Sequence, residues 1–230
     1  MNKGKLFGIG VGPGDTDLLT IKACKILKKV SVICSPRSSE SKDSIALSII
    51  KPVINERLDD FIVLDPVFPM IEDKKTLEKH WDDASNSIKE YLDKGVDVAF
   101  ITLGDPAIFS TFSYVLDRLS DDYDIEMVPG ITASTAVASS IGKPLVEKNE
   151  VLSIVPKIDN RIESIINDGD SIILMKPSRN KKELEDIISS QSGKKEIYSV
   201  ENCSMDNERI IEGFSKDKPY LTTTLIKFKK

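Results

Sequence analysis

The sequence predicts an α/β protein of two domains, with a mainly parallel sheet in the first domain and a mixed sheet in the second. Apolar, β-branched runs end in turn residues and are followed at once by helical patterns, which is typical of buried strands in a parallel sheet. Val96–Leu103, followed by Gly104-Asp105-Pro106, is the clearest case. Near the carboxyl end, Arg209–Phe214 and Leu221–Phe228 have strand patterns with no helix between them, which indicates an antiparallel hairpin or edge.

Composition narrows the class of protein. The 230 residues suffice for one large domain or two small ones, and 40% hydrophobic with 30% charged residues is usual for a soluble protein. No apolar run approaches the ~18–20 residues of a membrane span, and the glycine-rich start does not suit a signal peptide. We therefore expect a cytoplasmic protein without a membrane partner. The net charge of −5 argues against nucleic acid.

Cysteine and histidine are sparse. Cys24, Cys34 and Cys203 are far apart and form no CxxC pair, and His80 is the only histidine. This pattern predicts neither a metal site nor a disulfide framework.

The elements follow in order along the chain. The first domain, residues 1–120, is expected to contain strands Lys5–Val11, Val30–Ser35, Phe61–Leu64 and Val96–Leu103, and helices near Asp17–Lys29, Ser44–Ile50, Lys74–Lys94 and Ala107–Leu119. A polar run, Leu119–Tyr123, marks the boundary. The second domain, residues 121–230, is expected to contain strands Ile125–Val128, Val151–Val155, Ser171–Lys176 and Glu196–Val200, the two terminal strands, and helices near Thr132–Ile141, Asn160–Asn167 and Lys181–Gln191.

Three turns rich in glycine and proline each end a strand and open a helix: Gly8–Gly14, Gly104–Pro106 and Val128–Ala133. The first is not a dinucleotide fingerprint, because Pro13 or Asp15 stands where the third glycine is required. Each turn alone could be structural, with Asp105 simply capping a helix from Ala107. Ligands of open α/β sheets bind at the carboxyl ends of strands, so the three turns could converge on one cleft between the domains.

The stretches GIGVGPGDTDLLTIKA, LGDPAIFSTF and VPGITASTAVASSIGKPLVE, in this order, resemble those of the tetrapyrrole methylases. The resemblance covers essentially the whole chain. It implies a two-domain enzyme that uses S-adenosylmethionine as methyl donor, a cofactor cleft between the domains, and a homodimer. SPRSSESKDSIA, Phe68-Pro69-Met70 before Trp81, and Thr111–Tyr114 are most similar to the branch that methylates C20 of precorrin-2 or cobalt-factor II in cobalamin biosynthesis.

The resemblance also implies site residues. Those expected at the cofactor are Pro13, Leu103, Gly104, Asp105, Ile108, Thr132, Ala133, Met175, Cys203 and Thr223. Because the substrate is a polycarboxylate, cations should line its trough in the first domain, and the candidates are Arg37, Lys42 and Arg118. No residue is assigned as catalytic, since the methyl donor is already a strong electrophile and positioning supplies much of the barrier reduction.

Other functions remain open at this point. The chain could methylate another ring position, or act on diphthine or ribosomal RNA, although the negative charge argues against RNA. It could also bind S-adenosylmethionine or a nucleotide without catalysis. The sequence leaves open whether the substrate carries cobalt.

Overall fold

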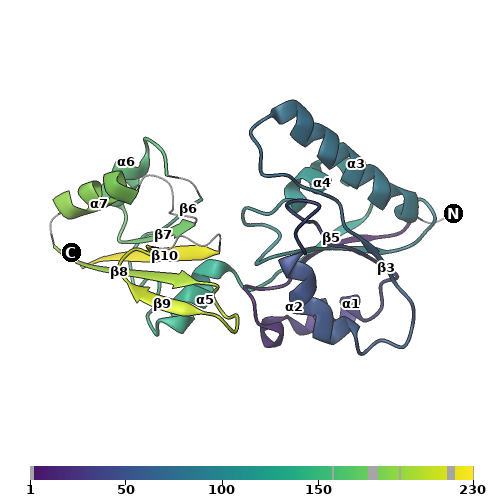
Figure 1. Cartoon of the computed structure of the whole chain (residues 1–230), viewed down its shortest axis with the longest axis horizontal. Coiled ribbons are helices and arrows are strands. Elements are labelled where there is room, and N and C mark those ends of the chain that lie inside the picture. Colours follow the sequence, from purple (N-terminus) through teal and green to yellow (C-terminus); the bar gives the residue numbers. More distant parts are fainter. Residues whose placement is uncertain (1–2, 157, 176–180, 192, 217–220, 230) are drawn as a thin grey trace. The chain divides into compact units, whose positions relative to one another are not determined.

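The computed structural model describes residues 3–156, 158–175, 181–191, 193–216 and 221–229. The chain divides into two compact units, Met1–Thr132 and Ala133–Lys230 (Figure 1). Each unit contains a five-stranded sheet with helices packed on it. The predicted fold class, two α/β domains, is confirmed.

The first unit is built on a parallel sheet. Its strands are β1 (Leu6–Gly10), β2 (Val32–Cys34), β3 (Ile62–Leu64), β4 (Val98–Thr102) and β5 (Ile125–Val128). They lie in the order β3-β2-β4-β1-β5, and all the pairs are parallel. Because β5 pairs with β1, it belongs to this sheet, and the units divide after Thr132 and not near Ser120 as the polar run indicated.

Helices cover both faces of this sheet. On one face lie α1 (Ile21–Leu27) and α2 (Ile45–Ile54), which pack with Ile9, Ile33 and Ile101. On the other lie α3 (Lys74–Leu92) and α4 (Phe112–Leu119). A short 3₁₀ helix, η1 (Thr16–Leu18), precedes α1, so the single helix expected over Asp17–Lys29 is in fact two pieces.

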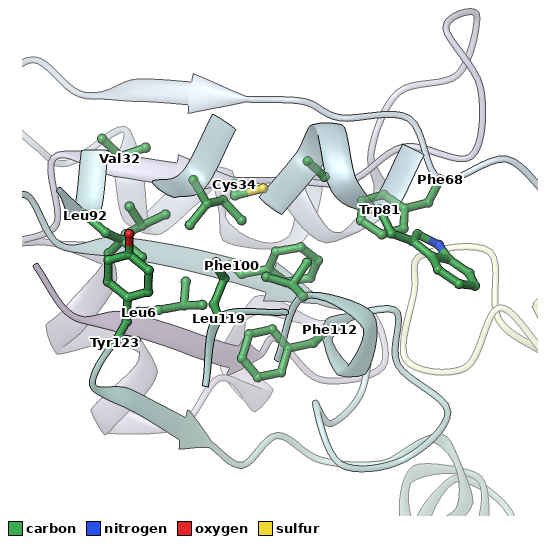
Figure 2. Packing of buried hydrophobic residues seen from close by; sticks show 14 residues of the cluster. Leu6, Val32, Cys34, Phe68, Trp81, Leu92, Phe100, Phe112, Leu119 and Tyr123 are labelled. Atoms are coloured by element: carbon green, nitrogen blue, oxygen red, sulfur yellow. The ribbon is translucent and has the colours of Figure 1, made fainter. Parts of the chain in front are cut away.

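Aromatic side chains fill the core under α3 and α4 (Figure 2). The Phe100 ring of β4 meets Phe68 edge-on, with centroids 6.2 Å apart, and Phe112 of α4 at 5.4 Å. A side chain at Gly8 would overlap the Phe112 ring. Gly8 therefore lets α4 approach β1, which is a packing role and not a ligand-binding one.

A charged group lies at the β1–β5 pair. The Glu126 carboxylate of β5 forms ion pairs with Lys22 and, at 2.9 Å, with Lys5. Hydrogen bonds from these two lysines, Lys22 first, lower the pKa of Glu126 to about 2.

The second unit has a mixed sheet. Its strands are β6 (Leu152–Val155), β7 (Ser171–Met175), β8 (Lys194–Glu201), β9 (Arg209–Glu212) and β10 (Thr222–Lys229), in the order β6-β7-β10-β8-β9. Only the β6–β7 pair is parallel among the described pairs. Its helices are α5 (Ala133–Ser140), α6 (Ile162–Asp168) and α7 (Lys181–Ser190).

Of the two alternatives expected for the last two strands, the hairpin is wrong, whereas the antiparallel edge position is confirmed for the first of them. β9 lies at the edge against β8, whereas β10 lies in the interior between β7 and β8. The burial of Leu225 and Ile226 explains the difference, since an apolar strand gains more in the centre of the sheet than at its edge. Within the described residues, no helix has the length and apolar character needed to cross a membrane.

Candidate functional site

The connections that follow β1 and β4 leave the sheet in opposite directions. These strands are neighbours, but α1 after β1 covers one face and α4 after β4 covers the other. This is a topological switch point, and the crevice at the carboxyl ends of such strands is where open α/β sheets bind ligands. The turns after β1 and β4 are therefore the first place to look for a site.

These two turns are joined through their backbones. The Gly12 N–H donates to the Gly104 carbonyl at 3.2 Å, and the Gly104 N–H donates to the Gly12 carbonyl at 2.8 Å. A side chain on Gly10 would lie 2.5 Å from the Gly104 oxygen and 2.6 Å from the nitrogen of Gly130. The third turn, after β5, therefore reaches the same point, and the three turns meet within the first unit.

Asp105 ties the second turn to the third. One carboxylate oxygen accepts the Ala107 N–H at 2.7 Å, and the other accepts the Gly130 N–H at 3.0 Å. Both oxygens thus hold backbone groups from segments that are far apart in the sequence. This arrangement favours a positioning role for Asp105 over a role as proton acceptor.

The helix expected from Ala107 begins later, at Phe112. Residues 105–111 form a loop instead, because Asp105 closes a turn onto Ala107 and Ser110 fixes the far end. The Ser110 hydroxyl donates to Thr102 Oγ1 at 2.8 Å and accepts the Phe112 N–H at 3.1 Å. The loop leaves Ile108 and Phe109 exposed at the carboxyl edge of the sheet.

Gly104 presents an open surface at the junction. Its φ of +71° is in the region that favours glycine, and among the described residues no atom beyond its chain neighbours lies within 4 Å of the position that a Cβ would take. Pro13 is buried in the neighbouring turn, and Leu103 is half-buried beside Gly104. The structure therefore brings Pro13, Leu103, Gly104 and Asp105 together, with Ile108 on the loop that follows.

The remaining cofactor candidates belong to other parts of the chain. Thr132 ends the first unit, and Ala133 opens α5 in the second. Met175 and Thr223 lie directly opposite each other on β7 and β10. Cys203 follows β8, and its sulfur is 3.5 Å from the Ser140 hydroxyl of α5.

The expected cations differ in how they are held. Arg118 forms ion pairs with Glu78 and Asp82 of α3 and lies over the Trp81 ring, so its charge is already compensated. Arg37 is bound to the Asp65 carboxylate at 2.9 Å and to the Glu40 carbonyl at 3.0 Å.

Lys42 is exposed on the loop between β2 and α2. In the part of the chain that is described, no three His, Cys, Asp or Glu side chains group as a metal site requires.

Gly10, Gly12 and Gly130 complete the junction, although sequence reasoning did not assign them to the site. The available signal was the position of all three at the carboxyl ends of strands. Their contacts with Gly104 join segments that are separated by up to about a hundred residues, so no local pattern reveals them.

Comparisons with known proteins show the family of the chain. The family model described as Tetrapyrrole (Corrin/Porphyrin) Methylases matches residues 5–218. A Methanocaldococcus jannaschii protein named probable cobalt-precorrin-2 C(20)-methyltransferase is 38% identical, over 97% of this chain and 96% of that protein. A Salmonella typhimurium cobalt-precorrin-2 C(20)-methyltransferase is 32% identical, over 75% of this chain and 73% of that protein.

Solved structures share the fold. A cobalt precorrin-4 methyltransferase matches with a TM-score of 0.76 and 20% identity, over 97% of this chain and 94% of that chain. A uroporphyrin-III C-methyltransferase from Thermus thermophilus, in complex with S-adenosylhomocysteine, matches with a TM-score of 0.65 and 18% identity, over 97% of both chains.

Proposed function

Since the chain belongs to the tetrapyrrole (corrin/porphyrin) methylase family, we propose that it methylates C20 of cobalt-precorrin-2 in cobalamin biosynthesis, with S-adenosylmethionine as the methyl donor. The observation that carries this proposal is the match to the Methanocaldococcus jannaschii protein along nearly the full length of both chains. Two relatives above 30% identity bear names that specify the cobalt-containing substrate, which favours it over precorrin-2.

The switch-point junction suits the methyl donor. The positive φ at Gly104 and the empty space where its side chain would be leave the backbone accessible to a ligand. Leu103 and Ile108 add partly exposed apolar side chains beside it. Apolar walls with a few backbone polar groups are the usual lining of a site for a nucleoside-containing molecule.

We assign Pro13, Leu103, Gly104, Asp105 and Ile108 to the donor site in the first unit, together with Thr132 at its end. Ala133, Met175, Cys203 and Thr223 of the second unit stay as further assignments. Bound S-adenosylmethionine would supply a methyl group on a positively charged sulfur. The protein's own contribution is orientation, which is worth up to ~7–11 kcal/mol when reacting atoms are held in line.

In this proposal Asp105 does not take part in the reaction itself but keeps the backbone of two turns in position. Its two hydrogen bonds keep the turn after β4 against the turn after β5, so that Gly104 stays open to the ligand. A preorganised site of this kind needs no movement when the ligand binds.

Cations should meet the carboxylates of the substrate. Lys42 is exposed on the loop after β2, and we retain it together with Arg37, whose side chain is 25% exposed and pairs with one carboxylate, that of Asp65. Arg118 is not retained, because Glu78 and Asp82 already compensate its charge.

The test is a turnover assay. Purified protein is incubated anaerobically with S-adenosylmethionine carrying a labelled methyl group and with cobalt-precorrin-2 or precorrin-2 in parallel. We expect one labelled methyl group on the macrocycle, faster transfer to the cobalt form, and product fragmentation that places the methyl group at C20.

The other outcomes separate the alternatives. Transfer to a different carbon would assign another ring position. Binding of S-adenosylmethionine without transfer to any tetrapyrrole would contradict the enzyme assignment and favour a non-catalytic binder. The homodimer and the cytoplasmic location stay predictions, and light scattering after gel filtration measures the first directly.

A further inference from the structure

Phe109 has an unfavourable backbone conformation without the packing that usually compensates for one. It lies in the loop between β4 and α4 with a φ of +50°, and its side chain is 58% exposed. Bulky residues are genuine outliers in this region, because the Cβ approaches the following carbonyl. Strain that persists at an exposed position beside a ligand site is a reason to look for a function.

The other residues of this kind are polar. Among the described residues, the non-glycine positions with positive φ are Phe109, Lys148, Asn202 and Ser204. Asparagine tolerates this conformation through local hydrogen bonds, whereas lysine has the same steric constraint at Cβ as phenylalanine. Phe109 is the aromatic residue among these four. Its ring cannot form a local hydrogen bond that would offset the positive φ, so its conformation needs another explanation.

Exposed apolar side chains gather around the same edge of the sheet. They come from the segments that follow the carboxyl ends of β3 and β4: Met70, Ile71, Ile108, Phe109 and Tyr114. These residues follow the two outer strands of a neighbouring set of three, since β2 lies between β3 and β4. A surface of this extent suits a ligand wider than the nucleoside assigned to the Gly104 turn.

Tyr114 is held rigidly in this group. Its ring stacks on Trp81 of α3 with centroids 3.8 Å apart and planes 8° apart. Trp81 is in turn covered by Arg118, which is anchored by its two ion pairs. The three side chains form a fixed stack, in which Arg118 has a structural function.

We propose that Phe109 is a positioning residue that stacks against one face of the tetrapyrrole macrocycle, with Tyr114 as the second aromatic contact. This inference rests on the proposed function. A reduced tetrapyrrole is a broad ring system with an apolar face and carboxylates at its periphery, which matches an apolar shelf better than the methyl donor does. The strained backbone holds the Phe109 ring out of the core, where it is available to the ligand.

The test distinguishes the effect of the backbone strain on stability from the effect of the aromatic ring on substrate binding. Phe109→Gly removes the ring and also the backbone strain, so the variant should unfold at the same or a higher urea concentration than the parent protein. Its KM and its dissociation constant for cobalt-precorrin-2 should rise by roughly tenfold, the effect of losing one aromatic stacking contact. Phe109→Tyr keeps the ring and should retain the parent values.

Lys148→Gly is the matched control. Lys148 has a φ of +49°, and it lies in the second unit, outside both assigned sites. The control should show a similar gain in stability without any change in KM.

Binding is also measured directly, by absorption titration of cobalt-precorrin-2 without the methyl donor. If the parent protein binds the macrocycle but transfers no methyl group, the proposed function fails, and weaker binding by Phe109→Gly still supports the aromatic contact. Equal affinities of parent and Phe109→Gly would overturn the inference, as would an absence of tetrapyrrole binding by the parent. Two further results with Phe109→Gly would also overturn it. An equal loss of affinity for S-adenosylhomocysteine would assign Phe109 to the donor site, and a change in oligomeric state would assign it to a subunit interface.

Discussion

Replacing Asp105 with asparagine should weaken the first unit at the point where its three turns meet. The carboxylate accepts two backbone N–H groups, from Ala107 and Gly130. An asparagine side chain has one acceptor oxygen, and its NH₂ group would face the other backbone donor. One charge-assisted hydrogen bond is lost, so the free energy of unfolding should fall by about 2 kcal/mol.

The chain contains a fluorescent probe of unfolding and a second aspartate that serves as the control. Trp81 is the only tryptophan and lies in the first unit, so its fluorescence in urea reports the unfolding of that unit. With an m-value of ~2 kcal/mol/M, the midpoint should move down by about 1 M. Asp73 caps α3 by accepting the Thr76 N–H at 2.8 Å, and the side chain of the same Thr76 also bonds its carboxylate. Because asparagine caps helices as well as aspartate does, Asp73→Asn should change the midpoint little.

Affinity for S-adenosylhomocysteine, measured by calorimetry, should fall in Asp105→Asn and remain unchanged in Asp73→Asn. The reasoning is refuted if the two variants have the same midpoint, because Asp105 would then contribute no more than an ordinary cap. It is also refuted if Asp105→Asn keeps full stability and full affinity for S-adenosylhomocysteine but loses turnover, since that result describes a catalytic base.

Three further predictions follow from packing, charge and burial. Gly8→Ala should destabilise the first unit by roughly 1–3 kcal/mol, because its methyl group would overlap the Phe112 ring, and adding Phe112→Leu should restore part of the loss in urea unfolding. Because the pKa of Glu126 is lowered, its ion pairs stabilise the fold fully above about pH 4.5 and progressively less as the pH falls toward about 2. Over that pH range Glu126→Gln should therefore lose less stability than the parent protein, as measured by thermal scans. Under native conditions a thiol reagent should label Cys24 first, because Cys24 is partly exposed whereas Cys34 is buried, with a raised pKa; mass mapping of early label on Cys34 would contradict the core assignment.

Local patterns located most elements because they depend on residues close in the sequence. The apolar run at β4 and the turn after it are recognisable from composition alone, and so is the alternation of strands and helices in the first unit. The polar run near Ser120 was misleading as a domain boundary, since it connects α4 to β5, and β5 pairs with β1 of the same sheet.

The errors arose where a distant partner decides the structure. Asp105 before Pro106 has the pattern of a helix start, but its second carboxylate oxygen is used by Gly130, and the helix begins at Phe112. Similarly, no local pattern shows that α3 supplies Glu78 and Asp82 to Arg118. Strand order in the second sheet has the same origin, because the pairing of β10 with β7 and β8 depends on tertiary packing.

The position of β1 has a consequence for how the chain folds during synthesis. β1 is made first, but its two neighbours are β4 and β5, so both of its edges stay unpaired until residues 98–128 have left the ribosome. Unpaired apolar strand edges promote aggregation, and pairing over such long sequence separations is slow. The Gly10–Gly104–Gly130 junction is then completed last, so the ligand site of the first unit forms only after the entire parallel sheet has assembled.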